Sequence, residues 1–215
     1  MLDPRSLEVY VVTSGVFGEG RDHRSIARAA VLGGATAIQL RAPELADDEL
    51  LPIAVDVAAM CRDAGLPLLV NDRIDVALRC GADGVHVGQD TDVVQARERI
   101  GSDRILGVSA ADAEEAAAAE RGGADYLGVT VWATPTKPDA VPRGLEGLHD
   151  VVLATALPVV GIGGIFASNA ALVLEAGAAG LAVVSAVAAA GDPVGATREL
   201  VEVVARFRAR QGVAG

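Results

Sequence analysis

Short runs of β-branched and other apolar residues alternate with longer, alanine-rich amphipathic segments from one end of the chain to the other. Such short runs are typical of strands buried on both faces, and the amphipathic segments are typical of helices that cover them. The alternation therefore indicates an α/β fold built around a parallel sheet. The predicted strands are residues 8–13, 37–41, 68–71, 84–87, 105–109, 126–131, 159–163 and 180–184. The predicted helices are residues 25–32, 47–64, 74–80, 93–100, 112–121, 145–154, 168–176 and 193–208.

A small glycine-containing unit recurs where a predicted helix ends and the next strand begins. Glycine ends a helix in the left-handed conformation, and corners of one kind indicate strands that all enter the sheet in the same direction. The chain of 215 residues therefore predicts a (β/α)8 TIM barrel that forms a single domain over residues 1–215. A doubly wound open sheet is the alternative, but the first strand lacks the glycine fingerprint of a dinucleotide site. The four units are Gly33-Gly34-Ala35-Thr36, Gly81-Ala82-Asp83-Gly84, Gly122-Gly123-Ala124-Asp125 and Gly177-Ala178-Ala179-Gly180.

Composition and charge narrow the class of protein. The chain is 51% hydrophobic, which is enough for a packed core and excludes an intrinsically disordered chain. Its 29 acidic and 18 basic residues give a formal charge of −11. Nucleic acids and anionic membranes attract positively charged surfaces, so neither is expected as a partner. We expect small-molecule substrates instead.

Nothing in the sequence predicts a membrane span, a disulfide framework or a zinc site. The uncharged stretch 151–174 contains Pro158 and Gly163, which interrupt a helix and would leave backbone groups unpaired in lipid. Cys61 and Cys80 lie apart, without a CxxC pattern or a neighbouring histidine. No secretory signal pattern is visible either, and we expect a cytoplasmic protein.

Polar residues stand at the carboxyl ends of several predicted strands. The carboxyl ends of the strands in a barrel of this kind form the face that carries the active site. Gln39 and Arg41 point to the same side of their strand, and an arginine inside a barrel is costly unless it meets an anion. Each residue alone could equally be a strand-end cap or a buried hydrogen-bonding group. The set comprises Gln39, Arg41, Asn71, Asp72, Gln89, Asp90, Ser109, Thr134, Thr136 and Lys137.

The last two predicted strands end in a pattern typical of a phosphate site. The seventh ends in Gly163-Gly164 and the eighth in Val184-Ser185. Loops after these two strands, together with the N-terminus of a short helix, commonly bind phosphate in this fold. Glycines let backbone N–H groups approach phosphate oxygens closely.

Taken in order along the chain, these motifs resemble the family of thiamine-phosphate synthases and the related TenI proteins. The resemblance rests on Gln39-Leu40-Arg41, Asn71-Asp72, His86-Val87-Gly88-Gln89, Thr134-Pro135-Thr136-Lys137 and Gly161-Ile162-Gly163-Gly164-Ile165. It implies a (β/α)8 barrel and a transferase of thiamine biosynthesis. The implied enzyme joins hydroxymethylpyrimidine diphosphate to thiazole phosphate, releases pyrophosphate and uses Mg²⁺ as its cofactor.

The resemblance also implies roles for individual residues. Asp72 and Asp90 would bind the metal, no residue would act as a covalent nucleophile, and His86 would be a structural residue of its strand. His23 and His149 are expected at the surface. Binding of the pyrimidine diphosphate falls to Gln39, Arg41, Asn71 and Ser109, binding of further phosphate oxygens to Thr134, Thr136 and Lys137, and binding of the thiazole phosphate to Gly164, Val184 and Ser185.

Three departures from the family pattern touch the diphosphate half of the predicted site. Pro43 replaces a lysine, Thr91 stands between Asp90 and Asp92 where the family has its second metal-binding aspartate, and the loop before Thr134 is one residue shorter. Two alternative functions follow: a TenI-like thiazole phosphate isomerase (tautomerase), and a phosphate-ligand-binding barrel without turnover. The intact Asn71-Asp72 pair favours the synthase. An apolar barrel rim is compatible with a homo-oligomer.

Overall fold

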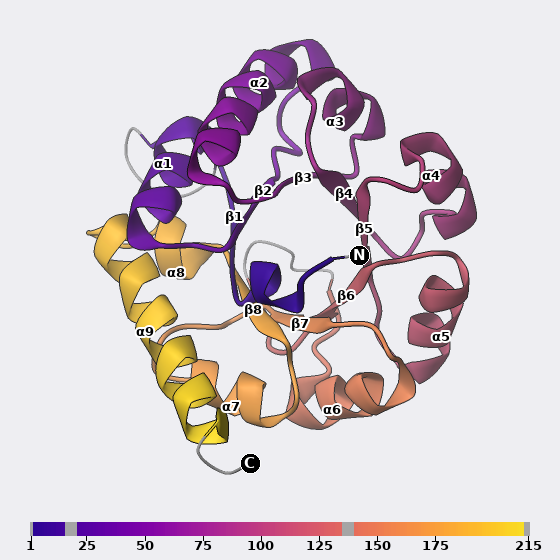
Figure 1. The fold of residues 1–215 in the computed structure, drawn as a ribbon, viewed down its shortest axis with the longest axis vertical. Helices are drawn as coiled ribbons and strands as arrows, with labels where there is room; N and C mark the ends of the chain where they lie inside the picture. The colour runs from indigo at the N-terminus through magenta and orange to yellow at the C-terminus, as the bar shows by residue number, and fades with distance from the viewer. Residues whose placement is uncertain (1, 16–20, 135–139, 213–215) are drawn as a thin grey trace.

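Eight parallel strands close into a barrel in a computed structural model that describes residues 2–15, 21–134 and 140–212 (Figure 1). Each strand pairs with the next one along the chain, and β8 pairs with β1 to close the ring. The predicted (β/α)8 TIM barrel in a single domain is confirmed. The strands are β1 (Val9–Val12), β2 (Ala37–Leu40), β3 (Leu68–Asn71), β4 (Gly84–Val87), β5 (Ile105–Ser109), β6 (Tyr126–Thr130), β7 (Val159–Ile162) and β8 (Gly180–Val183).

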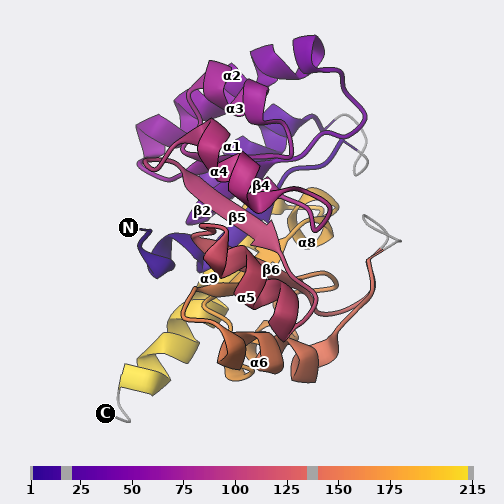
Figure 2. The same cartoon turned by 90° about the vertical axis from the view of Figure 1, so that its right-hand side faces the viewer.

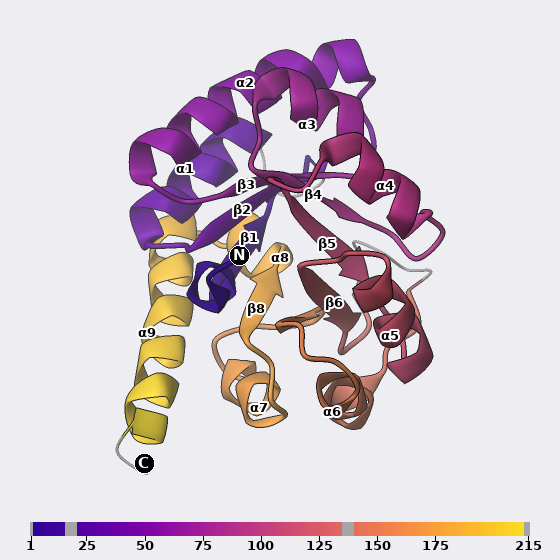
Figure 3. The same cartoon turned by 45° about the vertical axis from the view of Figure 1, so that its right-hand side comes forward.

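Helices form an outer ring around the barrel, so that β5, β6 and β8 are seen as arrows inside that ring in Figure 3. Two short elements were not predicted from the sequence: a 3-10 helix, η1 (Pro4–Leu7), and α8 (Ser185–Ala188). Both are too short to show a helical period in the sequence. The other helices are α1 (His23–Gly33), α2 (Asp47–Ala64), α3 (Ile74–Cys80), α4 (Val93–Ile100), α5 (Ala113–Arg121), α6 (Gly144–Ala154), α7 (Ala170–Glu175) and α9 (Pro193–Gly212).

Two predicted helix starts differ from the structure by two residues, for reasons of capping. Helix α1 begins two residues early, because the Asp22 side chain accepts the backbone N–H of Ser25 at 2.8 Å and caps the helix there. Helix α7 begins two residues late, because Asn169 Oδ1 accepts the N–H of Phe166 at 2.8 Å and closes a turn first.

The apolar core has two layers. The larger one fills the space between the sheet and the helices, and the smaller one fills the inside of the barrel. The inner layer contains Leu7, Tyr10, Leu69 and Tyr126, all buried. Leu7 belongs to η1, which lies across the end of the barrel where the strands begin (Figure 2). The opposite end of the barrel, where the strands finish, contains the candidate functional site described below.

The uncharged stretch 151–174 is divided among the end of α6, strand β7 and all of α7 except its last residue. Pro158 and Gly163 both lie outside the helices, so the prediction that they interrupt a helix in this stretch is confirmed. None of the helices in the described part of the chain is both long enough and apolar enough to cross a membrane.

Substitution of Gly180 by alanine should weaken the seam between β8 and the N-terminal segment. A β-carbon at Gly180 would lie 1.8 Å from the carbonyl oxygen of Leu7, which is backbone and cannot move aside cheaply. We expect Gly180→Ala to lower the free energy of unfolding by about 1–3 kcal/mol, as overpacking does. Urea unfolding measures this. Gly191→Ala is the matched control, because nothing lies within 4 Å of its β-carbon position. Equal stability of both variants would contradict the prediction.

Candidate functional site

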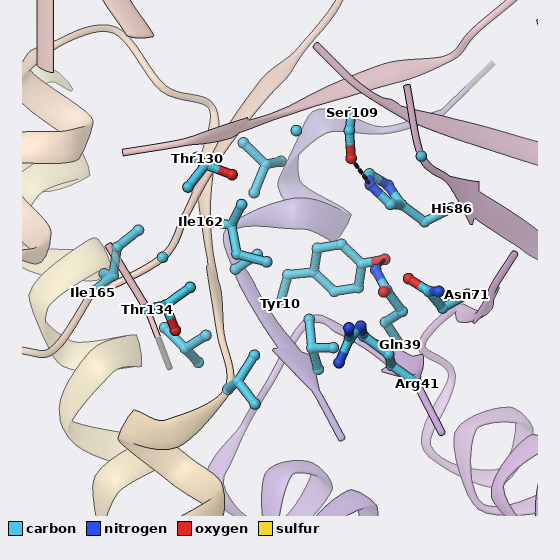
Figure 4. Close-up of a pocket in the computed structure, with 18 of the residues that line it drawn as sticks. Tyr10, Gln39, Arg41, Asn71, His86, Ser109, Thr130, Thr134, Ile162 and Ile165 are labelled. Carbon is cyan, nitrogen blue, oxygen red and sulfur yellow. Dashed lines mark hydrogen bonds between the residues drawn. The ribbon is translucent and has the colours of Figure 1, made fainter. Parts of the chain in front are cut away.

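The carboxyl ends of the strands surround one pocket, into which most of the predicted site residues point (Figure 4). In the view of Figure 4, Gln39, Arg41 and Asn71 lie on one side of the Tyr10 ring and Ile162 and Ile165 on the other. The pocket is lined by the predicted residues Gln39, Arg41, Asn71, Asp72, Ser109, Thr134, Gly164, Val184 and Ser185. Thr136 and Lys137 lie outside the described residues.

Arg41 presents a positive charge to the pocket. Its guanidinium makes no hydrogen bond or ion pair with another described residue, and its backbone N–H donates to Thr13 Oγ1 at 3.2 Å. A half-buried cation without a protein partner favours binding of an anion. The geometry therefore supports the predicted role of Arg41 in anion binding.

His23 is buried near the segment that carries Arg41, so the prediction of a surface position for it is wrong. Its Nδ1 lies 2.9 Å from Thr13 Oγ1 and its Nε2 lies 2.9 Å from Glu44 Oε1. Gly15 makes the arrangement feasible, because a β-carbon there would lie 2.2 Å from the Glu44 carboxylate. Because Thr13 Oγ1 also accepts the N–H of Arg41, these hydrogen bonds hold the segment from Arg41 to Glu44 at both ends. His149, by contrast, is exposed as predicted.

Asp72 is the only carboxylate among the described residues that line the pocket. Its backbone has φ 57°, a left-handed conformation that is rare outside glycine and often marks a functional position. Its Oδ1 accepts the N–H of Gly88 at 3.1 Å, and its Oδ2 accepts Asn71 Nδ2 at 2.5 Å. These bonds hold the carboxylate in place.

The structure does not bring Asp90 into the pocket lining. Asp90 is exposed in the loop after β4, and its neighbour Asp92 uses Oδ1 to cap α4 by accepting Gln95 N–H at 3.0 Å. Gln89 donates to Glu115 Oε2 at 2.7 Å. In the described part of the chain, no group of three histidine, cysteine or acidic residues is placed to hold a metal. Mg²⁺ is usually bound by one or two carboxylates together with waters and substrate phosphates, so Asp72 by itself fits such an ion.

The pocket floor contains three residues that were not predicted as site residues: Tyr10, His86 and Tyr126. Tyr126 OH lies 2.9 Å from both Tyr10 OH and His86 Nδ1. The Tyr126 ring fits because residue 107 is glycine, where a β-carbon would lie 2.2 Å from Tyr126 Cζ. Burial raises the pKa of both tyrosines well above the ordinary value, so both phenols stay neutral. A glycine inside a predicted strand, here Gly107, is the feature of the sequence that could have indicated a bulky side chain packed beside it.

His86, expected to be a structural residue of its strand, also lines the pocket. Its Nε2 lies 3.1 Å from Ser109 Oγ, the contact drawn as a dashed line in Figure 4. Position 128 on the next strand but one is glycine, and a β-carbon there would lie 3.1 Å from His86 Cε1. His86 thus connects the buried phenols to a predicted ligand-binding hydroxyl.

Two glycines shape the opposite side of the pocket. Gly163 and Gly164 have φ of 92° and 65°, and a β-carbon at Gly163 would lie 2.6 Å from the carbonyl oxygen of Trp132. Asn169 Nδ2 donates to the Gly164 carbonyl at 2.9 Å, whereas the Gly164 N–H has no backbone partner among the described residues. Helix α8 begins at Ser185 beside it. Backbone N–H groups in this setting favour a phosphate.

Comparison with known proteins points to one family. A family model described as thiamine monophosphate synthase matches residues 9–187. The chain is 49% identical over 194 residues to the thiamine-phosphate synthase of Chloroflexus aurantiacus, covering 89% of this chain and 90% of that protein. It is 48% identical over 206 residues to the thiamine-phosphate synthase of Moorella thermoacetica, covering 94% and 98%. The solved thiamine phosphate pyrophosphorylase of Pyrococcus furiosus has a TM-score of 0.87 and 40% identity, covering 95% of this chain and 98% of that chain.

Arg41 should carry a large part of the affinity of the pocket for polyanions. A hydrogen bond to a charged group contributes roughly 1.5–3 kcal/mol, so we expect Arg41→Gln to weaken pyrophosphate binding about tenfold to a hundredfold. Isothermal titration calorimetry with pyrophosphate measures this. Arg28→Gln is the control, since Arg28 is exposed on α1 and does not line the pocket. Equal losses in the two variants would indicate a general effect of net charge and not a site at Arg41.

Proposed function

The chain belongs to the thiamine monophosphate synthase family and is a transferase of thiamine biosynthesis, and we propose that this pocket is where its reaction takes place. The reaction joins hydroxymethylpyrimidine diphosphate to thiazole phosphate and releases pyrophosphate. The observation that carries the proposal is one pocket with polar groups suited to phosphate binding on two sides: a cation and a candidate metal ligand on one side, and backbone N–H donors on the other. Arg41 and Asp72 follow β2 and β3, and Gly164 and Ser185 follow β7 and β8 across the mouth of the barrel.

The chemistry needs positioning and charge stabilisation more than it needs a nucleophile from the protein. The bond between the pyrimidine methylene carbon and the diphosphate oxygen breaks, and both electrons leave with pyrophosphate. The thiazole nitrogen then forms a new bond to the same carbon, whose positive charge is shared by the pyrimidine ring. Arg41 and Asn71 face the side where negative charge accumulates on the leaving group. Donors fixed in advance at such a place lower the barrier, because they need no rearrangement during the reaction.

Mg²⁺ is the proposed cofactor, and Asp72 is the proposed ligand within the pocket. When bound beside the diphosphate, the ion would neutralise charge on the leaving group. Asp72 suits this role because its carboxylate is fixed by Gly88 and Asn71 and faces the pocket. Asp90 stays the proposed second carboxylate, because Asp92 is already engaged as a helix cap.

The thiazole phosphate is proposed to lie at the glycine side of the pocket. The Gly164 N–H and the start of α8 at Ser185 offer donors to its phosphate, and Val184 lines the same wall. Ile162 and Ile165 add apolar surface beside them, which suits a thiazole ring. Thr134 approaches from the β6 side, and Thr136 and Lys137 keep their predicted roles in binding phosphate oxygens.

We also propose that the protein is cytoplasmic and that it forms a homo-oligomer. Both cysteines, Cys61 and Cys80, are free and buried, and a reducing compartment such as the cytoplasm maintains free thiols. A homo-oligomer stays a prediction from the apolar barrel rim.

The synthase reaction is tested by incubating the purified chain with both substrates and Mg²⁺ and measuring pyrophosphate release. We expect release that requires both substrates. A chain that binds thiazole phosphate tightly and isomerises its ring without releasing pyrophosphate would be the TenI-like alternative, and tight binding with neither reaction would be the non-catalytic alternative. Both outcomes would contradict the proposal.

The two metal-binding proposals are tested separately by the dependence of the rate on Mg²⁺ concentration. Asp72→Asn should reduce turnover by roughly a hundredfold, the loss of a charge-assisted contact in a reacting site, and leave thiazole phosphate affinity within a few fold. Asp90→Asn should raise the Mg²⁺ concentration for half-maximal rate. Asp92→Asn is the matched control, because asparagine caps a helix as well as aspartate does. Identical Mg²⁺ curves for the Asp90 and Asp92 variants would exclude Asp90 as a ligand.

A further inference from the structure

A chain of four hydrogen bonds runs across the pocket floor from Gln39 to Ser109. Gln39 Nε2 donates to Tyr10 OH at 2.7 Å, and Tyr10 OH lies 2.9 Å from Tyr126 OH. Tyr126 OH lies 2.9 Å from His86 Nδ1, and His86 Nε2 lies 3.1 Å from Ser109 Oγ. The five residues come from β1, β2, β4, β5 and β6. The two ends of the chain, Gln39 and Ser109, both line the pocket.

Counting donors and acceptors gives this chain a direction. Each neutral phenol has one proton to donate, and a buried hydroxyl without a partner is costly. Because Tyr10 OH accepts from Gln39, its own proton goes to Tyr126 OH, and the Tyr126 proton then goes to His86 Nδ1. In this direction a neutral His86 has its proton on Nε2 and donates to Ser109 Oγ, which lies 3.1 Å away. The Ser109 proton is left to point into the pocket.

At Gln39, the other end of this chain of hydrogen bonds, the polarity is opposite. Gln39 uses its amide nitrogen on Tyr10, and its Oε1 makes no hydrogen bond with another described residue. No buried polar side-chain atom of the described residues lacks a partner, so this oxygen is open to the pocket. The pocket thus offers an acceptor at Gln39 and a donor at Ser109.

We propose that Gln39, Tyr10, Tyr126, His86 and Ser109 form a directional relay that selects a ligand edge carrying one donor and one acceptor. Tyr10, Tyr126 and His86 are positioning residues in this relay. Resting on the proposed function, the ligand edge is that of an aminopyrimidine, whose exocyclic N–H donates and whose ring nitrogen accepts.

Through the relay, whether Ser109 offers a donor or an acceptor to the pocket depends on which group Gln39 offers. Rotation of the Gln39 amide by a half turn would make Tyr10 donate to Gln39, and every later bond would reverse until Ser109 became the acceptor. In both directions the ends differ in polarity, so an edge with two acceptors or two donors always leaves one pocket group unpaired. Such a mismatch should weaken ligand binding by roughly tenfold to a hundredfold, because a buried polar group without a hydrogen-bond partner is costly.

The direction of the relay also explains why Ser109 is not a nucleophile. A serine is activated when a neighbouring histidine nitrogen accepts its proton. In the direction set by the Gln39 amide nitrogen, His86 Nε2 carries a proton and donates to Ser109, and the third member is the Tyr126 phenol in place of a carboxylate. The pair is built to orient a hydroxyl and not to remove its proton.

The test is the position of the His86 proton, read by nitrogen NMR on protein labelled with ¹⁵N-histidine and free of ligand. The chain has three histidines, and the His86 signals are assigned by their loss in His86→Gln. We expect the proton on Nε2 in the wild-type chain. In Gln39→Glu at a mildly alkaline pH we expect it on Nδ1, because a carboxylate beside Arg41 can only accept and reverses the relay. A proton on Nδ1 in the wild type, or on Nε2 in Gln39→Glu, would overturn the proposal.

A double variant shows whether the hydroxyls transmit the change. In Gln39→Glu with Tyr10→Phe, the chain is cut between Gln39 and Tyr126, and the His86 proton should return to Nε2. Persistence of the change without the Tyr10 hydroxyl would mean that the field of the carboxylate acts directly, and the relay would be wrong.

Tyr126→Phe keeps the ring volume and removes the central hydroxyl, and it serves if Gln39→Glu does not fold. We expect a mixture of both His86 proton positions and a KM for the pyrimidine substrate raised about tenfold, as loss of one buried hydrogen bond does. The KM for thiazole phosphate should stay unchanged. Thr197→Val is the control, since Thr197 is a buried hydroxyl outside the pocket that donates to Pro193 O at 2.8 Å. An unchanged His86 spectrum in Tyr126→Phe overturns the relay, whereas absent pyrophosphate release by the wild type overturns only the proposed function.

Discussion

Closure of the sheet between β1 and β8 is the constraint on which the site depends. The pairing of Val9 with Leu181 completes a ring in which all strands run the same way, so every strand finishes at the same end of the barrel. Residues that are far apart in the sequence, such as Arg41 and Ser185, thereby line one pocket. The bare backbone of Gly180 against Leu7 is part of that closure, because a side chain would not fit there.

The two sides of the pocket are built from different material. Backbone N–H groups and tight glycine turns at Gly163 and Gly164 form one side, and side chains such as Arg41 and Asp72 form the other. A backbone site survives most substitutions, whereas a side-chain site changes with each residue that contributes to it. The departures at Pro43 and Thr91 both fall on the side made of side chains, in keeping with this difference.

The sequence predicted the strands to within two residues because apolar runs and glycine corners are local signals. It missed α8 because a single turn shows no periodicity, and it misplaced His23 because that burial depends on Thr13 and Glu44, which are distant along the chain. Tyr10 and Tyr126 were not predicted as site residues, since nothing local distinguishes an inward phenol that reaches a pocket from one that only packs. The predicted ligand-binding residues came from family motifs, and their grouping around one pocket required the closed barrel.

The contact between Gly163 and Trp132 links the loops that follow β6 and β7. Trp132 N–H donates to the Gly163 carbonyl at 3.3 Å, and no side chain separates the two backbones. Thr134 stands two residues beyond Trp132, and Gly164 adjoins Gly163. The backbones after β6 and β7 are therefore held against each other, so the first residues of one loop and the glycine turn of the other keep a fixed spacing at the mouth of the barrel.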